Sequence, residues 1–253
     1  MFIAAIIGLW LGGTSGLLLG AAIGFVLGRV LQATARQRLL TVQSQFLDTT
    51  FVVMGAICKA DGVVTRDEIR ATEDVFVRLA LTPEQKVAAR AAFTRGKAPD
   101  LDLDAEVDRF VQTARGGAVL FHLFLQVQLL AVIADGQVHP AERALLVRVA
   151  RRLGLGEGDV ARLEALLRAA TAGAATAGPA PKQQLDDAYS ALGVTAETSE
   201  AEIKRAYRKL MSENHPDKLA AKGLPEGMRQ LAEERAREIN VAYALIRKAR
   251  QFD

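Results

Sequence analysis

The stretch that decides the C-terminal fold reads Arg205-Ala206-Tyr207-Arg208-Lys209-Leu210-Met211-Ser212-Glu213-Asn214-His215-Pro216-Asp217-Lys218. Its first part has the apolar spacing of an amphipathic helix. Pro216 must end that helix, because proline lacks an amide hydrogen and its ring clashes with the preceding turn. We therefore expect His215 and Asp217 to stand on a stiff, solvent-facing turn, which suits recognition better than core packing.

Apolar residues at helical spacing predict that this helix pairs with a second one further along the chain. The two facing stripes are Ile203, Ala206, Tyr207 and Leu210, and Leu231, Ile239, Ala242, Tyr243 and Ile246. Ser199 and Glu202 form a capping box at the helix start. The pattern predicts an antiparallel helical hairpin with the His-Pro-Asp turn at one tip.

Three flanking motifs make this region resemble the J-domain of the DnaJ (Hsp40) co-chaperones. They are Tyr189-Ser190-Ala191-Leu192-Gly193-Val194, Ala206-Tyr207-Arg208-Lys209-Leu210 and Ile239-Asn240-Val241-Ala242-Tyr243-Ala244-Leu245-Ile246, in the family's order. The resemblance implies that His215, Pro216 and Asp217 contact an Hsp70. It assigns the same role to the basic residues off the apolar stripe, which are Lys204, Arg205, Arg208 and Lys209.

Length and charge limit the classes of protein this can be. A chain of 253 residues suits one or two modest domains plus an anchor. The formal charge of +3 is mild and its basic residues gather in two places, so we expect no nucleic-acid partner. Cys58 is the only cysteine, which excludes an intrachain disulfide and a Cys-rich zinc site and fits a reducing compartment.

The N-terminal segment predicts a transmembrane helix. No charged side chain occurs from residue 2 to residue 28, a run long enough to cross a bilayer. Arg29, Arg36 and Arg38 follow, and the first acid is Asp48. The positive-inside rule then places the short N-terminus outside and the rest of the chain in the cytoplasm, with a single membrane span.

A cleaved signal peptide is the alternative for this segment, since Ala33-Thr34-Ala35 has the small-x-small pattern of a cleavage site. However, no Lys or Arg precedes the apolar run, and the run is longer than the apolar part of a signal peptide. We therefore favour a retained anchor.

Glycine recurs at every fourth position of the anchor, at Gly8, Gly12, Gly16, Gly20, Gly24 and Gly28. Such a strip lets a second backbone approach closely in lipid and predicts a homodimer through the anchor. The alternative is that glycine is simply common in membrane helices.

The middle region, residues 46–168, reads as helical and contains an internal repeat. Ala60-Asp61-Gly62-Val63-Val64-Thr65-Arg66-Asp67-Glu68 returns as Ala134-Asp135-Gly136-Gln137-Val138-His139-Pro140-Ala141-Glu142. Each copy follows an apolar helix and precedes another helix. The pattern predicts two helical hairpins related by pseudo-symmetry.

This region resembles the tellurite-resistance TerB-like domain, and the resemblance implies metal ligands at Asp61, Glu68, Asp135 and Glu142. Helix capping and tight-turn chemistry explain these residues without a metal, and the oxygen-ligand pattern of an EF-hand is absent. We therefore expect no cofactor. His122 and His139 have no nucleophile motif beside them, and the chain has no P-loop, so we expect no enzyme activity.

Residues 169–184 are rich in Ala, Gly, Thr and Pro and predict a flexible tether. We therefore expect an all-α chain. Its parts, in order, are a transmembrane anchor (1–31), a juxtamembrane linker (32–45), a TerB-like domain (46–168), the tether (169–184) and a J-domain (185–253).

This architecture resembles the DnaJ-like protein A (DjlA) family of membrane-anchored co-chaperones. The resemblance implies that the chain binds the cytoplasmic Hsp70 DnaK and stimulates its ATP hydrolysis. Two alternatives remain open. One is an envelope-stress adaptor that acts mainly through the TerB-like domain. The other is an enzyme with His215 and Asp217 as an acid–base pair, for which an exposed tip offers no substrate pocket.

Overall fold

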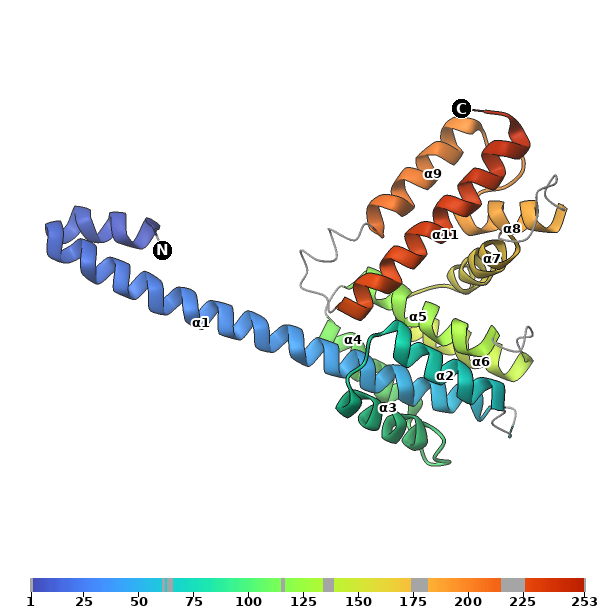
Figure 1. The fold of residues 1–253 in the computed structure, drawn as a ribbon, viewed down its shortest axis with the longest axis horizontal. Helices are drawn as coiled ribbons and strands as arrows, with labels where there is room; N and C mark the ends of the chain where they lie inside the picture. Colours follow the sequence, from blue (N-terminus) through green and yellow to red (C-terminus); the bar gives the residue numbers. More distant parts are fainter. Residues whose placement is uncertain are drawn as a thin grey trace. The chain divides into compact units, whose positions relative to one another are not determined.

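The computed structural model describes residues 2–60, 62, 66–114, 117–133, 139–173, 182–214 and 226–252. All regular secondary structure in these ranges is helical (Figure 1), which confirms the all-α fold class. The helices are α1 (Phe2–Cys58), α2 (Arg66–Arg78), α3 (Pro83–Gly96), α4 (Leu103–Ala114), α5 (Ala118–Val132), α6 (Pro140–Arg152), α7 (Glu157–Gly173), α8 (Lys182–Leu192), α9 (Glu200–Glu213) and α11 (Glu226–Arg250).

The chain divides into two compact units, Met1–Ser44 and Gln45–Asp253. Helix α1 runs through the boundary, so the predicted anchor and the predicted linker 32–45 belong to one continuous helix. In the part of the chain that the structure describes, no helix is both long and apolar enough to cross a membrane. The predicted transmembrane helix therefore rests on the sequence.

The core of the TerB-like region is built around aromatic side chains from three helices. Phe46 from α1, Phe110 from α4 and Phe124 from α5 are fully buried. Their ring centroids lie 5.1 to 6.0 Å apart, in stacked and edge-to-face arrangements that aromatic quadrupoles favour. Helix α5 is apolar nearly all round, as expected of a helix covered on several sides.

Helices α1 and α3 cross with their backbones in contact. A Cβ added at Gly55 would lie 2.2 Å from the carbonyl oxygen of Phe93, and one at Gly96 would lie 2.0 Å from that of Val52. No side chain larger than hydrogen fits either position. The sequence pattern did not single out this pair of glycines.

Both copies of the predicted internal repeat lie between two helices. The C-terminal part of α1 leads through the first repeated turn into α2, and α5 leads through the second into α6. Most of each turn, including Asp61 and residues 134–138, lies outside the described residues.

Helix α7 joins the TerB-like region to the C-terminal helices. It packs against both α8 and α11. Leu166 from α7 is buried in one cluster with Leu192, Ile203 and Ile246. Of the predicted tether, residues 169–173 belong to α7 and residues from Lys182 onward to α8, while residues 174–181 lie outside the described part. The two regions thus share a hydrophobic core.

Candidate partner-binding site

The predicted first helix of the J-like region, α8, ends in a motif that explains its sequence signature. The Val194 N–H donates to the Tyr189 carbonyl (3.0 Å), and the Gly193 N–H donates to the Ser190 carbonyl (2.9 Å). This is a Schellman motif, in which the residue after the helix is left-handed, and Gly193 has a φ of +70°. Glycine is required here because it adopts this conformation without strain.

Helix α9 begins and ends where the sequence predicts. The Ser199 N–H donates to Glu202 Oε2 (3.1 Å), and Ser199 Oγ accepts from the Glu202 N–H (3.4 Å), which confirms the capping box. The Ser199 hydroxyl (2.6 Å) and the Ser199 N–H both donate to the Glu202 carboxylate, and these two bonds hold the pKa of Glu202 below its ordinary value. The helix ends at Glu213, before Pro216, and Asn214 caps it by donating Nδ2 to the Leu210 carbonyl (2.7 Å).

Helices α9 and α11 form the predicted hairpin. Ile203 is fully buried between them and α8. Tyr207 and Tyr243 stack with centroids 4.1 Å apart, and the Tyr207 hydroxyl donates to Asn240 Oδ1 (2.8 Å). The two tyrosines therefore fix the helices side by side, as the core-packing interpretation predicts.

The basic residues of α9 do not all have the same surroundings. Lys204 is half-buried, pairs with Glu200 (2.6 Å) and lies over the Phe252 ring. Arg205, Arg208 and Lys209 are exposed and form no ion pair with any residue in the described part of the chain. Positions 205, 208 and 209 share one helix face. The structure therefore leaves three cations on one face of α9 available to a partner.

The His215-Pro216-Asp217 turn lies outside the described residues. Asn214, the last described residue before it, is buried (4% exposed). The start of the turn is therefore attached to a helix end that is anchored in the fold.

Of the four predicted metal ligands, the structure describes the side chain of Glu142 alone. Asp61, Asp135 and the side chain of Glu68 lie outside the described residues. Glu142 is 3% exposed, and its Oε2 accepts the His139 N–H (2.9 Å) as part of a capping box. Within the described residues, no group of three or more His, Cys, Asp or Glu could hold a metal. For Glu142, the capping interpretation is confirmed.

The predicted glycine strip is covered only in part by the structure. Gly8, Gly12, Gly16 and Gly20 lie where the surroundings of α1 are not described. A Cβ at Gly28 would meet nothing within 4 Å, so this position is open to a neighbour.

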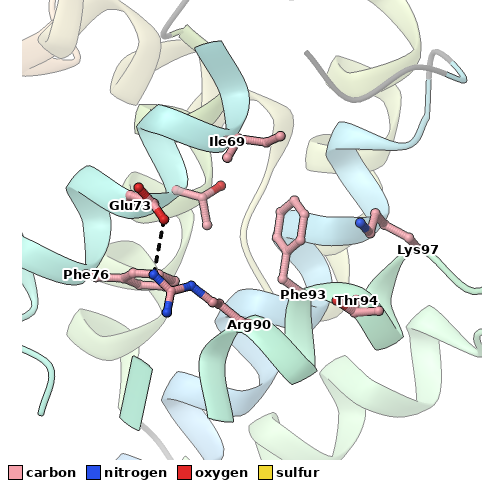
Figure 2. Close-up of a pocket in the computed structure, with 8 residues that line it drawn as sticks. Ile69, Glu73, Phe76, Arg90, Phe93, Thr94 and Lys97 are labelled. Carbon is pink, nitrogen blue, oxygen red and sulfur yellow. Dashed lines mark hydrogen bonds and ion pairs between the residues drawn. The ribbon is translucent and has the colours of Figure 1, made fainter. Parts of the chain in front are cut away.

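A pocket between α2 and α3 was not predicted from the sequence. It has a volume of about 240 Å³. Figure 2 shows Arg90 paired with Glu73 (3.1 Å) above the Phe76 ring, with Ile69 and Phe93 facing the same space. Lys97 lies over Phe93 (5.1 Å to the ring centroid). An apolar slot with cations at its rim can bind a ligand, and no residue motif signals it because two separate helices form it.

Two titratable side chains on α11, the buried Arg235 and the half-buried Glu238, have shifted pKa values. Burial lowers the pKa of Arg235 to about 10, partly offset by the Glu238 carboxylate. Burial also raises the pKa of Glu238 to about 7, although nearby Arg235 opposes the shift. Glu238 Oε2 accepts a hydrogen bond from Gln126 Nε2 of α5 (3.2 Å). Sequence periodicity gave no sign of either burial, because the helices that cover α11 are distant in the chain.

Comparison with known proteins identifies both regions. The family model "Tellurite resistance protein TerB" matches residues 48–165, and the model "DnaJ domain" matches residues 187–251. A Vibrio cholerae protein named "Co-chaperone protein DjlA" is 42% identical over 223 residues, which cover 81% of this chain and 78% of that protein. Proteins of the same name are 39% identical in Shewanella oneidensis (82% and 79% covered) and 37% identical in Coxiella burnetii (99% and 97% covered). No solved structure matches.

Proposed function

Because the chain belongs to the family of DjlA co-chaperone proteins, we propose that it binds a cytoplasmic Hsp70 of the DnaK type and stimulates its ATP hydrolysis through His215-Pro216-Asp217. As a J-domain co-chaperone it is a regulator and not an enzyme in itself. Family membership makes the chain a co-chaperone. The more specific proposal, that it stimulates DnaK through this turn, is supported by the residues around the turn.

The observation that carries the proposal is the exposed cationic face of α9. Arg205, Arg208 and Lys209 are exposed on the helix that precedes the His-Pro-Asp turn, and this helix is capped at both ends. Free cations on a rigid helix steer an acidic partner surface and lose little conformational freedom on binding. Lys204 contributes less, because it is already paired with Glu200. Since the cations are exposed, salt should weaken the association.

Single-turnover ATP hydrolysis by a bacterial Hsp70, with the full chain added in mild detergent, tests this function. We expect stimulation by the native chain, none by His215→Gln, and salt-sensitive weakening by Arg208→Glu. Lys248→Glu is the matched control, because Lys248 is an exposed cation on α11. Equal stimulation by the native chain and His215→Gln would refute the role of the turn. No stimulation by the native chain would refute the proposed function.

We further propose that the N-terminal part of α1 is a single-pass inner-membrane anchor, with the N-terminus in the periplasm, and that it forms a homodimer through its glycines. The uncharged run 2–28 and Arg29, Arg36 and Arg38 support this topology. Large apolar side chains in this helix are also exposed, among them Phe25 (50%) and Leu27 (60%). An exposed apolar surface of this kind suits lipid.

Extraction and crosslinking test the anchor and the dimer separately. We expect the chain to stay in the membrane fraction after alkaline carbonate washing, which an unanchored chain would not do. Crosslinking in membranes should give a dimer that Gly16→Leu together with Gly20→Leu abolishes, whereas Leu17→Ala leaves it intact. A dimer that survives the glycine substitutions would refute the glycine interface.

A second candidate function is an adaptor in envelope-stress signalling that acts through the TerB-like region. The pocket in Figure 2 favours it, because residues of α2 and α3, with Lys97 just after α3, line this pocket and no residue of the J-domain helices does. If an envelope-stress response survives His215→Gln but is lost when residues 46–168 are deleted, the adaptor function is supported. Loss of the response in both variants would support the co-chaperone function instead.

A further inference from the structure

A second cavity lies where helices of the TerB-like region meet those of the J-domain. It has a volume of about 180 Å³ and is lined by residues of α5, α7, α9 and α11. This volume is roughly ten times what one water molecule needs by the same measure. The cavity therefore has room for a small ligand.

Arg235 of α11 lines this cavity, and its side chain forms no hydrogen bond with the described residues. Its side chain is 4% exposed, and neither Nε nor Nη1 forms a hydrogen bond within the described part of the chain. Burial lowers the pKa of Arg235 only to about 10, so the guanidinium remains charged at neutral pH. A buried charge without hydrogen bonds is costly, which favours a ligand or water at these donors.

Arg162 of α7 brings a second guanidinium to the same cavity. Its Nε is buried without a hydrogen-bond partner in the described residues, and Nη1 lies 3.4 Å from Asp159 Oδ1. A Cβ added at Gly193 would lie 3.0 Å from Arg162 Nε, so the turn after α8 packs directly against this guanidinium. The side chain is thereby held in position.

The carboxylates that line the cavity leave these donors unsatisfied. Asp159 Oδ2 accepts the Gly156 N–H (2.9 Å) at the start of α7, and Oδ1 faces Arg162 and His122. Glu213 is exposed, and among the described residues it forms no ion pair with Arg235. The three unsatisfied atoms, Arg162 Nε and Arg235 Nε and Nη1, are all donors. The missing group must therefore be an acceptor.

We propose that this cavity is a binding site for a small oxyanion, a phosphate or a carboxylate, held by Arg235 and Arg162. A guanidinium donates two parallel N–H groups that match the oxygens of either anion. Asn214 also lines the cavity and directly precedes His215 in the sequence, so the anion lies against the cap of the helix that carries the Hsp70-facing residues.

Calorimetric titration of the full chain in mild detergent tests this site without any Hsp70, so its failure is distinct from failure of the co-chaperone function. Inorganic phosphate and acetate are titrated separately, with ionic strength held constant by sodium chloride. We expect saturable binding of at least one of them, and the stronger binder identifies the class of anion. Arg235→Met should weaken binding by at least about tenfold, because two charged hydrogen bonds are lost.

Two further variants make the test independent of one substitution. Arg162→Met should weaken binding several-fold, and it replaces Arg235→Met as the test if that variant does not fold. Arg237→Met is the matched control, because Arg237 is on the same helix but exposed and paired with Glu233. Absence of saturable binding, or equal binding by the native chain and Arg235→Met, would overturn the proposal and leave water as the occupant.

Discussion

In the TerB-like region, aromatic rings from three helices interlock around Phe110, whereas the J-domain hairpin buries mainly alanine, leucine and isoleucine side chains. The first region is closed by direct contact of two helix backbones at Gly55 and Gly96. The second completes its core with Leu166, which comes from α7. Its helix α11 also carries the buried Arg235 and the half-buried Glu238, whose pKa values are both shifted.

This difference suggests a division of tasks between the two regions. Close backbone contact and large interlocked rings leave little room for adjustment, because packed interiors tolerate extra volume poorly. A small core that includes a neighbouring helix and a buried charge depends on its surroundings. We therefore expect the TerB-like region to be the rigid base and the J-domain to respond to changes in α7 and in pH.

The largest effect is expected from Gly96→Ala. Its Cβ would lie 2.0 Å from the Val52 carbonyl oxygen, so α1 and α3 must separate. We expect a loss of at least about 3 kcal/mol in the free energy of unfolding, measured by urea denaturation of the full chain. Gly158→Ala is the control, because a Cβ there meets nothing within 4 Å and should change stability by less than about 1 kcal/mol. Equal effects of the two would contradict the close crossing.

Leu166→Ala should destabilise the J-domain more than the TerB-like region, although Leu166 itself belongs to α7. Leu166 is 2% exposed in the cluster shared with α8 and α11, so its truncation should cost about 2 to 3 kcal/mol. Hydrogen exchange should accelerate in α8 more than in α5. Val87→Ala, at a side chain 66% exposed, is the control. Unchanged exchange in α8 would mean that the J-domain core does not depend on α7.

Glu238→Gln should remove a pH dependence of stability. Burial raises the pKa of Glu238 to about 7, so its protonated form stabilises the fold below the unfolded pKa, and this stability is lost as pH rises through about 7. The neutral glutamine keeps an acceptor for Gln126. Relative to the native chain, we expect the variant to gain about 1 to 3 kcal/mol of stability between pH 5 and pH 8.

Urea unfolding across this pH range provides the measurement for Glu238→Gln. The exposed neighbour Glu233 supplies the control variant, Glu233→Gln, which should show no comparable gain. If the difference between Glu238→Gln and the native chain is the same at pH 5 and pH 8, the burial of Glu238 does not control the pH response.

The smallest effect is expected from Arg78→Ala. Arg78 Nη1 lies 2.8 Å from Glu234 Oε2 and links α2 to α11, but both side chains are partly exposed, at 44% and 31%. An exposed ion pair of this kind contributes at most about 1 kcal/mol. A double-mutant cycle with Glu234→Ala at two salt concentrations measures it. If this coupling energy is larger than the stability lost in Leu166→Ala, then charge, and not apolar contact, holds the J-domain to its neighbour.

Local signals in the sequence predicted the helix boundaries well. Ser199 with Glu202 at the start of α9, and His139 with Glu142 at the start of α6, form the hydrogen bonds that their spacing predicts. Gly193 ends α8 in the left-handed conformation that its motif requires. Each of these features depends on residues within one or two turns of each other, so a short window of sequence contains all of the relevant chemistry.

The sequence alone therefore determined the helical class, the two recognised regions and the cationic face of α9, because apolar periodicity and capping act locally. Only the tertiary structure decided that Gly55 meets Gly96, that α7 completes the J-domain core, and that Arg235 is buried beside Arg162. These contacts join residues that are far apart in the chain. They depend on which helix faces meet, and the periodicity of a single helix carries no information about its partner.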